Sequence, residues 1–249
     1  MKSNKSRQNI VEDIPYFYSP DIIEQQQLSG TEAQHAFKVL RLRVGAEIRI
    51  TDGKGHLYSA ILCSNSLSQA NLSNIRLIDN DTLYRPKLHI AIAPTKNMDR
   101  LEFALEKLTE VGVEFFSIVI TEHTIRDRIN MERLQKIMVS AMKQSRKLVA
   151  TKLQMYNSLS EFLETDLPKG RYIGYCGDYS VKTDICQSFE KNVDSCMLIG
   201  PEGDFTMEEV QIASKSGFNV VSLGKERLRT ETAAIYAGFV HHIMNNCEL

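Results

Sequence analysis

The chain has 249 residues, of which 43% are hydrophobic, enough to bury one large core or two modest ones. Its formal net charge of −1 gives no overall sign of a nucleic-acid-binding protein. No apolar stretch approaches the roughly 20 residues that a membrane-spanning helix needs, so we expect no membrane attachment.

The cysteines and the N-terminus indicate the compartment. The 5 cysteines form no C-x-x-C pair and have no zinc-type spacing with the 6 histidines, so we expect reduced thiols and no bound metal. The polar segment 1–13 lacks the apolar core of a signal peptide. The sequence therefore predicts a cytoplasmic protein.

The first third of the chain is predicted to form a disordered tail, residues 1–14, and a small β-domain, residues 15–80. A polar, proline-terminated link over 80–86 marks its end. The strands expected in this domain are 16–18, 47–51, 56–62 and 71–77.

Two local signals complete this domain. Residues 52–55, Asp-Gly-Lys-Gly, predict a hairpin turn between the second and third strands. Thr31, followed three residues later by Gln34, predicts the capping box of a single helix. A small β-barrel or sheet is the natural interpretation.

Residues 87–249 differ from the first domain, because predicted strands and helices alternate along them. The strands expected here are 88–93, 115–120, 172–176, 195–199 and 219–223. The helices expected are 99–112, 131–149, 206–216 (with a Thr206/Glu209 capping box and a Gly217 stop) and 231–244. This alternation predicts an α/β domain whose mostly parallel sheet is covered by helices on both faces.

Two of these strands end in glycine-containing loops, Leu198-Ile199-Gly200-Pro201-Glu202-Gly203 and Leu223-Gly224. Ligands of open α/β sheets bind at such strand ends. The Rossmann and Walker A fingerprints are both missing, and Glu202 and Asp204 would repel a pyrophosphate. A ligand with a cationic centre fits better, although the first loop alone is equally typical of an ordinary turn.

Two basic clusters stand out locally. One is formed by Lys38, Arg41, Arg43 and Arg49. The other lies between Thr121 and Lys152, a segment that contains 8 basic and only 3 acidic residues. Either cluster alone is more typical of a solvated face than of a binding surface.

Motifs along most of the chain resemble the ribosomal RNA small subunit methyltransferase E family, within the SPOUT class of methyltransferases. The matching segments are His35-Ala36-Phe37-Lys38-Val39-Leu40-Arg41, Ala93-Pro94-Thr95-Lys96 with Asp99, Thr121-Glu122, Met142-Lys143-Gln144-Ser145, the loop 198–203, and Leu223-Gly224 with Leu228-Arg229-Thr230-Glu231-Thr232-Ala233. The chain departs from the family pattern at Lys143, where an acidic residue is common, and near 146–151, which lacks the usual Gly and Pro.

The resemblance implies a fold and an activity. The second domain would be a SPOUT-type α/β domain with a C-terminal trefoil knot, preceded by a PUA-like β-barrel that holds RNA. The enzyme would be a homodimer that uses S-adenosylmethionine to methylate N3 of a uridine in the decoding region of 16S rRNA, within the small ribosomal subunit. The apolar composition of the last helix also favours a homodimer.

The resemblance also implies roles for individual residues. The cofactor-binding set is Leu198, Ile199, Gly200, Pro201, Glu202, Gly203, Leu223, Gly224, Leu228, Thr232 and Ala233. Glycine at 200, 203 and 224 would leave space for the ligand. Together with the basic clusters, the resemblance gives an RNA-binding set of His35, Lys38, Arg41, Arg43, Lys96, Arg126 and Arg146.

Methylation of N3 requires loss of the N3 proton and stabilisation of the resulting charge. Arg229 is the candidate for charge stabilisation and Glu231 the candidate proton acceptor. Alternatively, these two residues form a structural ion pair. Two other functions stay open: a SPOUT methyltransferase acting on another RNA nucleotide, and a non-catalytic RNA-binding factor of ribosome assembly.

Overall fold

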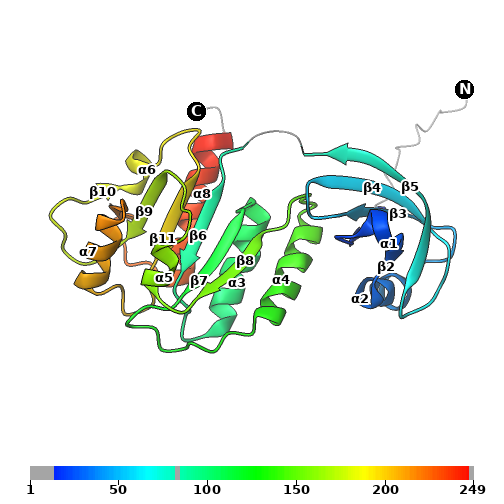
Figure 1. Cartoon of the computed structure of the whole chain (residues 1–249), viewed down its shortest axis with the longest axis horizontal. Helices are drawn as coiled ribbons and strands as arrows, with labels where there is room; N and C mark the ends of the chain where they lie inside the picture. Colours follow the sequence, from blue (N-terminus) through cyan, green and yellow to red (C-terminus); the bar gives the residue numbers. More distant parts are fainter. Residues whose placement is uncertain (1–13, 82–84, 247–249) are drawn as a thin grey trace, which may run out of the picture. The chain divides into compact units, whose positions relative to one another are not determined.

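The computed structural model describes residues 14–81 and 85–246, so the tail expected over 1–14 lies outside the described residues apart from Ile14. The chain divides into two compact units, residues 1–81 and 82–249 (Figure 1). No helix in the described ranges is both long enough and apolar enough to span a membrane.

The first unit is a curled five-stranded sheet in the order β1-β3-β4-β5-β2. Its strands are β1 (Tyr16–Tyr18), β2 (Gln27–Leu28), β3 (Glu47–Thr51), β4 (His56–Leu62) and β5 (Ala70–Asn80). The expected hairpin turn joins β3 to β4, and the Asp52 carboxylate accepts N–H groups of Lys54 and His56 across it. The core of the unit contains Phe17, Ile48 and Leu62.

The helix of this unit begins earlier than predicted. After the short α1 (Ile22–Gln25), α2 (Gly30–Gln34) has Ser29 as its N-cap and continues into a π-helical turn, η1 (His35–Val39). The prediction of a capping box that begins at Thr31 was therefore wrong. A Cβ at Gly30 would lie 3.1 Å from the Ser68 carbonyl oxygen, so the first helical residue is set by close backbone packing that the capping pattern does not reveal.

The second unit contains a seven-stranded sheet in the order β10-β12-β9-β11-β6-β7-β8, and every pairing given for it is parallel. Its strands are β6 (Leu88–Ile92), β7 (Phe115–Val119), β8 (Lys152–Tyr156), β9 (Gly170–Gly174), β10 (Thr183–Asp184), β11 (Ser195–Ile199) and β12 (Asn219–Ser222). β6 and β11 are buried at every position, as expected for central strands of a parallel sheet.

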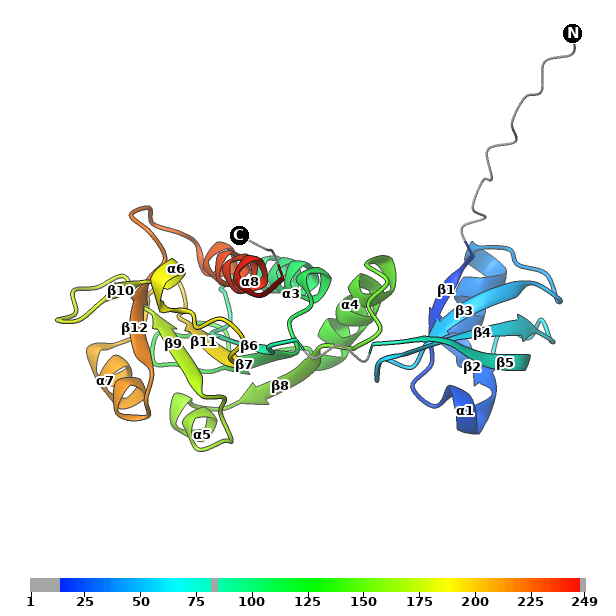
Figure 2. The ribbon, with the colours of Figure 1, turned by 90° about the horizontal axis from the view of Figure 1, so that it is seen from above.

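Helices cover both faces of this sheet, as predicted (Figure 2). They are α3 (Met98–Val111), α4 (Met131–Gln144), α5 (Leu159–Leu163), α6 (Ile185–Ser188), α7 (Met207–Lys215) and α8 (Thr230–Asn246). Figure 2 shows α3, α4 and α8 on one face and α5 and α7 on the other. The capping box of Thr206 and Glu209 at the start of α7 is confirmed, and Gly217, with φ +86°, follows its end.

The predictions for this unit missed β10, α5 and α6 and were inaccurate at α4, β8 and β9. α4 ends at Gln144 rather than 149, because Arg146 adopts a left-handed conformation with φ +55°. β9 begins and ends two residues earlier than the predicted strand. β8, which follows α4, was not predicted, because this edge strand has no fully buried residue to give a hydrophobic pattern.

Gly238 lies where α8 packs tightly against α3. A Cβ at this position would lie 2.5 Å from Cδ2 of Leu108, which is itself fully buried in α3. Glycine in a helix normally costs about 1 kcal/mol relative to alanine. Here it lets the two helices pack.

We expect Gly238→Ala to lower the free energy of unfolding by about 1–3 kcal/mol, the usual cost of overpacking. In a Leu108→Ala background the obstacle is gone, and the same change should raise stability through helix propensity. Urea denaturation of the four proteins measures both effects. An equal effect of Gly238→Ala in the two backgrounds would contradict this account of the packing.

Candidate active site

Four neighbouring strands have their carboxyl ends on the same side of the parallel sheet, and this row of strand ends is called the carboxyl edge. Ile199 at the end of β11 is in register with Gly174 of β9 on one side and Ile92 of β6 on the other. β12 follows beside β9. The loops after these strands therefore lie at the same edge. They include the 200–205 loop and the 223–229 loop, which overlap the two predicted cofactor segments, 198–203 and 223–233.

Asp204 organises the 200–205 loop. Its carboxylate accepts the N–H of Phe205 (2.9 Å) and the N–H of Cys176 (2.8 Å), which lies in the loop after β9. Its own N–H donates to the carbonyl of Pro201 (2.9 Å). Burial and then the Asp204 carboxylate raise the pKa of the Cys176 thiol, so this cysteine stays protonated.

Glu202 links the same loop to the end of β6. One of its carboxylate oxygens accepts the N–H of Lys96 at 3.0 Å. The two acidic side chains that argued against a pyrophosphate ligand thus form hydrogen bonds within the protein. They connect the loops after β6, β9 and β11.

The three loop glycines serve different purposes. A Cβ at Gly200 would lie 3.1 Å from the ring of Phe205, and one at Gly203 would lie 3.1 Å from Cβ of His123. At these two positions close protein neighbours already leave little room for a side chain, so packing within the protein is a reason for glycine besides room for a ligand. Gly224 has φ +109°, and no described atom lies within 4 Å of the place that a Cβ would occupy, so it combines a left-handed backbone with open space.

The loop after β7, which contains the predicted Arg126, also reaches this edge, and sequence reasoning missed its contact through His123. His123 Nδ1 lies 3.0 Å from the carbonyl oxygens of both Gly203 and Asp204. The N–H of Glu122 donates to the Glu209 carboxylate at 2.9 Å. These contacts join residues about 80 positions apart, so no local sequence signal could have revealed them.

The 223–229 loop leads into α8, where the two predicted catalytic residues lie. Arg229 is exposed, and Glu231, two residues later, is buried. Glu231 Oε1 lies 3.7 Å from Nε of Arg100 in α3, so the ion pair of Glu231 is with Arg100 and not with Arg229. Its Oε2 is buried and has no hydrogen-bond partner within the described residues.

The rest of the predicted cofactor set lies around the same edge. Leu198, Ile199 and Pro201 are buried, Leu223 and Leu228 are partly buried, and Thr232 and Ala233 lie in the first turn of α8, Thr232 exposed and Ala233 buried. The structure thus brings all members of this set to the ends of β11 and β12 and the start of α8.

The predicted RNA-binding residues fall into three places. Lys96 and Arg126 are exposed in loops at the carboxyl edge of the sheet. Arg146 follows α4 and precedes β8, so it lies at the opposite edge and is not brought to the site of its own unit.

The remaining RNA-binding candidates belong to the first unit. Lys38, Arg41 and Arg43 are exposed there, next to the exposed apolar side chains of Val39 and Val44. His35 is only partly exposed, since its ring packs edge-on against Phe17 at a centroid distance of 5.8 Å. The structure therefore groups three cations around η1 and the turn that follows it.

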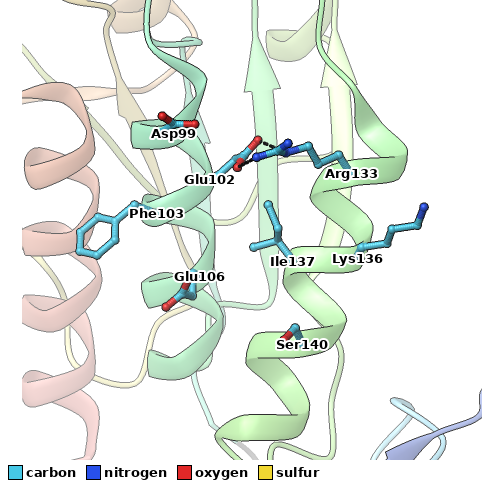
Figure 3. A pocket seen from close by; sticks show the side chains of 8 residues that line it. All are labelled: Asp99, Glu102, Phe103, Glu106, Arg133, Lys136, Ile137 and Ser140. Carbon is cyan, nitrogen blue, oxygen red and sulfur yellow. Dashed lines mark hydrogen bonds and ion pairs between the residues drawn. The ribbon is translucent and has the colours of Figure 1, made fainter. Parts of the chain in front are cut away.

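A groove of about 520 Å³ between α3 and α4 is a separate feature (Figure 3). Arg133 of α4 crosses it and binds the Glu102 carboxylate of α3 with Nε (2.5 Å) and a terminal nitrogen (2.7 Å). Lys136, on its rim, pairs with Glu132. The charges of Glu102, Arg133 and Lys136 in this groove are thus paired within the protein. Among the described residues no cluster of His, Cys, Asp and Glu could hold a metal ion.

Comparison with known proteins agrees with this architecture. The family model of the RNA methyltransferase domain matches residues 83–241, and that of the RNA methyltransferase PUA domain matches residues 28–62. Ribosomal RNA small subunit methyltransferase E of Rickettsia conorii is 29% identical over 232 residues, which cover 89% of this chain and 91% of that protein.

Two solved structures extend the comparison. A probable rRNA-methyltransferase from Porphyromonas gingivalis has a TM-score of 0.86 and 36% identity, covering 94% of this chain and 99% of that one. Ribosomal RNA small subunit methyltransferase E from Neisseria gonorrhoeae, solved bound to S-adenosyl methionine, has a TM-score of 0.74 and 27% identity, covering 93% and 98%. Since the first family model matches well over half of the chain, this protein belongs to the RNA methyltransferase family that includes ribosomal RNA small subunit methyltransferase E.

Proposed function

We propose that this protein is an S-adenosylmethionine-dependent methyltransferase that modifies N3 of a uridine in the decoding region of 16S rRNA. The observation that carries the proposal is that the 200–205 and 223–229 loops both lie at the carboxyl edge of the parallel sheet, in a chain of this family. We expect it to act in the cytoplasm, where ribosomal subunits are assembled.

The residues at this edge fit the cofactor. The backbone at Gly224 is open, and hydrogen bonds within the 200–205 loop and from the loop after β9 hold the first cofactor loop. The residues proposed to hold the cofactor are Leu198, Ile199, Gly200, Pro201, Glu202, Gly203, Leu223, Gly224, Leu228, Thr232 and Ala233. When bound, S-adenosylmethionine supplies a methyl group on a sulfonium centre.

Arg229 and Glu231 are proposed to prepare the uracil ring. Loss of the N3 proton leaves negative charge on N3 and the two carbonyl oxygens. The Arg229 guanidinium is exposed beside the 223–229 loop and forms no ion pair with a described residue, so it is available to stabilise this charge. Glu231 is the proposed proton acceptor because its Oε2 has no partner among the described residues, while Arg100 lies beside Oε1.

A complementation experiment tests this function. 16S rRNA from a deletion strain should lack 3-methyluridine by mass spectrometry, and the wild-type gene should restore it. With purified protein, Arg229→Ala should lower the methyl-transfer rate on the order of 100-fold or more, the usual cost of losing a charge-stabilising donor. Glu231→Gln should also lower it.

Lys215→Ala, which removes a cation at the end of α7, is the matched control and should methylate normally. An unchanged 3-methyluridine content in the deletion strain would refute the proposed substrate. A normal rate for Arg229→Ala would refute only the role of that residue.

The first unit is proposed to hold RNA through the cationic surface formed by Lys38, Arg41 and Arg43. These side chains are exposed, and a family model for a PUA domain covers part of the unit. Binding of this kind is electrostatic and depends on salt, because cations on the protein release counterions from phosphates.

Reversal of Arg41 and Arg43 to Glu should weaken binding of small-subunit RNA and flatten its salt dependence, with a slope lower by roughly 1–2. Affinity for S-adenosylmethionine should not change. Lys54→Glu with Arg76→Glu makes the same charge change elsewhere in this unit and is the control. Filter binding at several salt concentrations distinguishes the two. Equal losses in both double variants would contradict a localised RNA surface.

We also propose a C-terminal trefoil knot, which the sequence resemblance implies. α8 packs against α3, β6 and β11, whereas α7, which precedes it, covers the other face of the sheet (Figure 2). The chain from α7 through β12 to α8 therefore passes from one face to the other, as a threaded C-terminal segment requires.

The protein is further proposed to form a homodimer through α8 and α3. Tyr236, Phe239 and Ile243 form an exposed stripe on α8, and Phe103 of α3 is 49% exposed. Apolar stripes of this kind on a protein surface are typical of protein interfaces. Light scattering at micromolar concentration should give the mass of a dimer, and Phe239→Glu should shift it toward the monomer; a wild-type monomer would refute the proposal.

A further inference from the structure

The loop after β7 contacts the 200–205 loop across an intervening strand. In the sheet, β6 lies between β7 and β11, so the loops that follow β7 and β11 are not adjacent by topology. They nevertheless meet at His123, and the neighbouring Glu122 bonds Glu209 at the start of α7. The order of the strands alone therefore does not produce this contact, which depends on the side chains of the two segments.

His123 holds the two peptide units on either side of Asp204. Its Nδ1 lies 3.0 Å from the Gly203 carbonyl oxygen and 3.0 Å from the Asp204 carbonyl oxygen. Since both neighbours are acceptors, Nδ1 carries the proton and donates to them. The absence of a Cβ at Gly203 lets the imidazole approach, because a Cβ would lie 3.1 Å from that of His123.

Asp204 needs such support. Its φ is +62°, a left-handed conformation that aspartate adopts at a lower cost than most non-glycine residues and that hydrogen bonds to the same segment stabilise. The same residue binds the N–H groups of Cys176 and Phe205 through its carboxylate. If the backbone of Asp204 relaxes, both of these hydrogen bonds lose their geometry.

Glu209 provides the second anchor of the same segment. One carboxylate oxygen accepts the N–H of Glu122 and the other accepts the N–H of Thr206, each at 2.9 Å. The loop after β7 is thus bound just beyond the 200–205 loop as well, through the capping box of α7. The imidazole of His123 is the contact that acts on the loop itself.

We propose that His123 is a positioning residue for the cofactor: by fixing the carbonyls on both sides of Asp204, it keeps the 200–205 loop in its cofactor-binding conformation. The inference rests on the proposed location of the cofactor at this loop. It assigns to His123 no contact with the reacting atoms. Its removal should therefore affect cofactor binding more than the rate at saturation.

Three variants separate the hydrogen bond from the bulk of the side chain. Asparagine places an amide N–H near the position of Nδ1, glutamine places its amide near Nε2, and alanine removes both. Calorimetric titration with S-adenosylhomocysteine should give affinities about 10-fold weaker for His123→Ala and His123→Gln, the loss expected for one or two hydrogen bonds. His123→Asn should stay within about 3-fold of wild type.

Kinetics and folding provide the remaining readouts. KM for S-adenosylmethionine should rise in the Ala and Gln variants while kcat at saturating cofactor stays near that of wild type. Circular dichroism and thermal unfolding check that each variant is folded. If the Ala variant is unstable, the affinities of the Asn and Gln variants, whose side chains are similar in polarity, can still be compared with each other.

The outcomes are distinct. Wild-type affinity in His123→Gln, or an Asn variant as weak as the Gln variant, would overturn the positioning role while leaving the cofactor site in place. Failure of the wild-type protein itself to bind S-adenosylhomocysteine would overturn the cofactor site and this inference with it.

Discussion

The parallel direction of all seven strands in the second unit determines where its chemistry lies. Parallel strands end at the same edge, so β12, β9, β11 and β6 deliver four loops to one place. Each loop leaves a strand whose backbone is already fixed by neighbours on both sides. Segments from four distant parts of the sequence are thereby brought to one end of the sheet, and hydrogen bonds join the loops after β6, β9 and β11.

The loops at this edge are supported mainly by hydrogen bonds between side chains and backbone. Asp204, Glu202, Glu209 and His123 each bind backbone groups of a neighbouring loop or helix end. None of these contacts needs a ligand. A loop formed in advance loses less conformational freedom when a ligand binds, and this strengthens binding.

Much of the fold follows from sequence patterns because the patterns are local. The buried strands β6, β7, β11 and β12 and the helices α3 and α7 were recognised by their periodicity and caps. The errors occurred where backbone conformation or non-local contacts determine the structure. The left-handed Arg146 ends α4 although the apolar pattern continues. The edge strand β8 lacks a buried face, so its sequence has no strand pattern.

The candidate site was predictable only in part for the same reason. Glycine-rich strand ends mark the two cofactor loops, but the pairing of Glu231 with Arg100 and the contact of His123 with the 200–205 loop join residues about 80 or more positions apart. Such contacts depend on how the sheet is ordered, which the local sequence does not encode.

The position of β6 in the sheet has a consequence for synthesis of the chain. β6 pairs with β7, which follows it closely, and with β11, which is made roughly 100 residues later. At ribosomal speeds of about 5–20 residues per second, β6, a strand that is buried at every position in the finished fold, stays for several seconds without its second neighbour. Unpaired strand edges are prone to aggregate, so the synthesis of β11, late in the chain, removes this risk from the second unit.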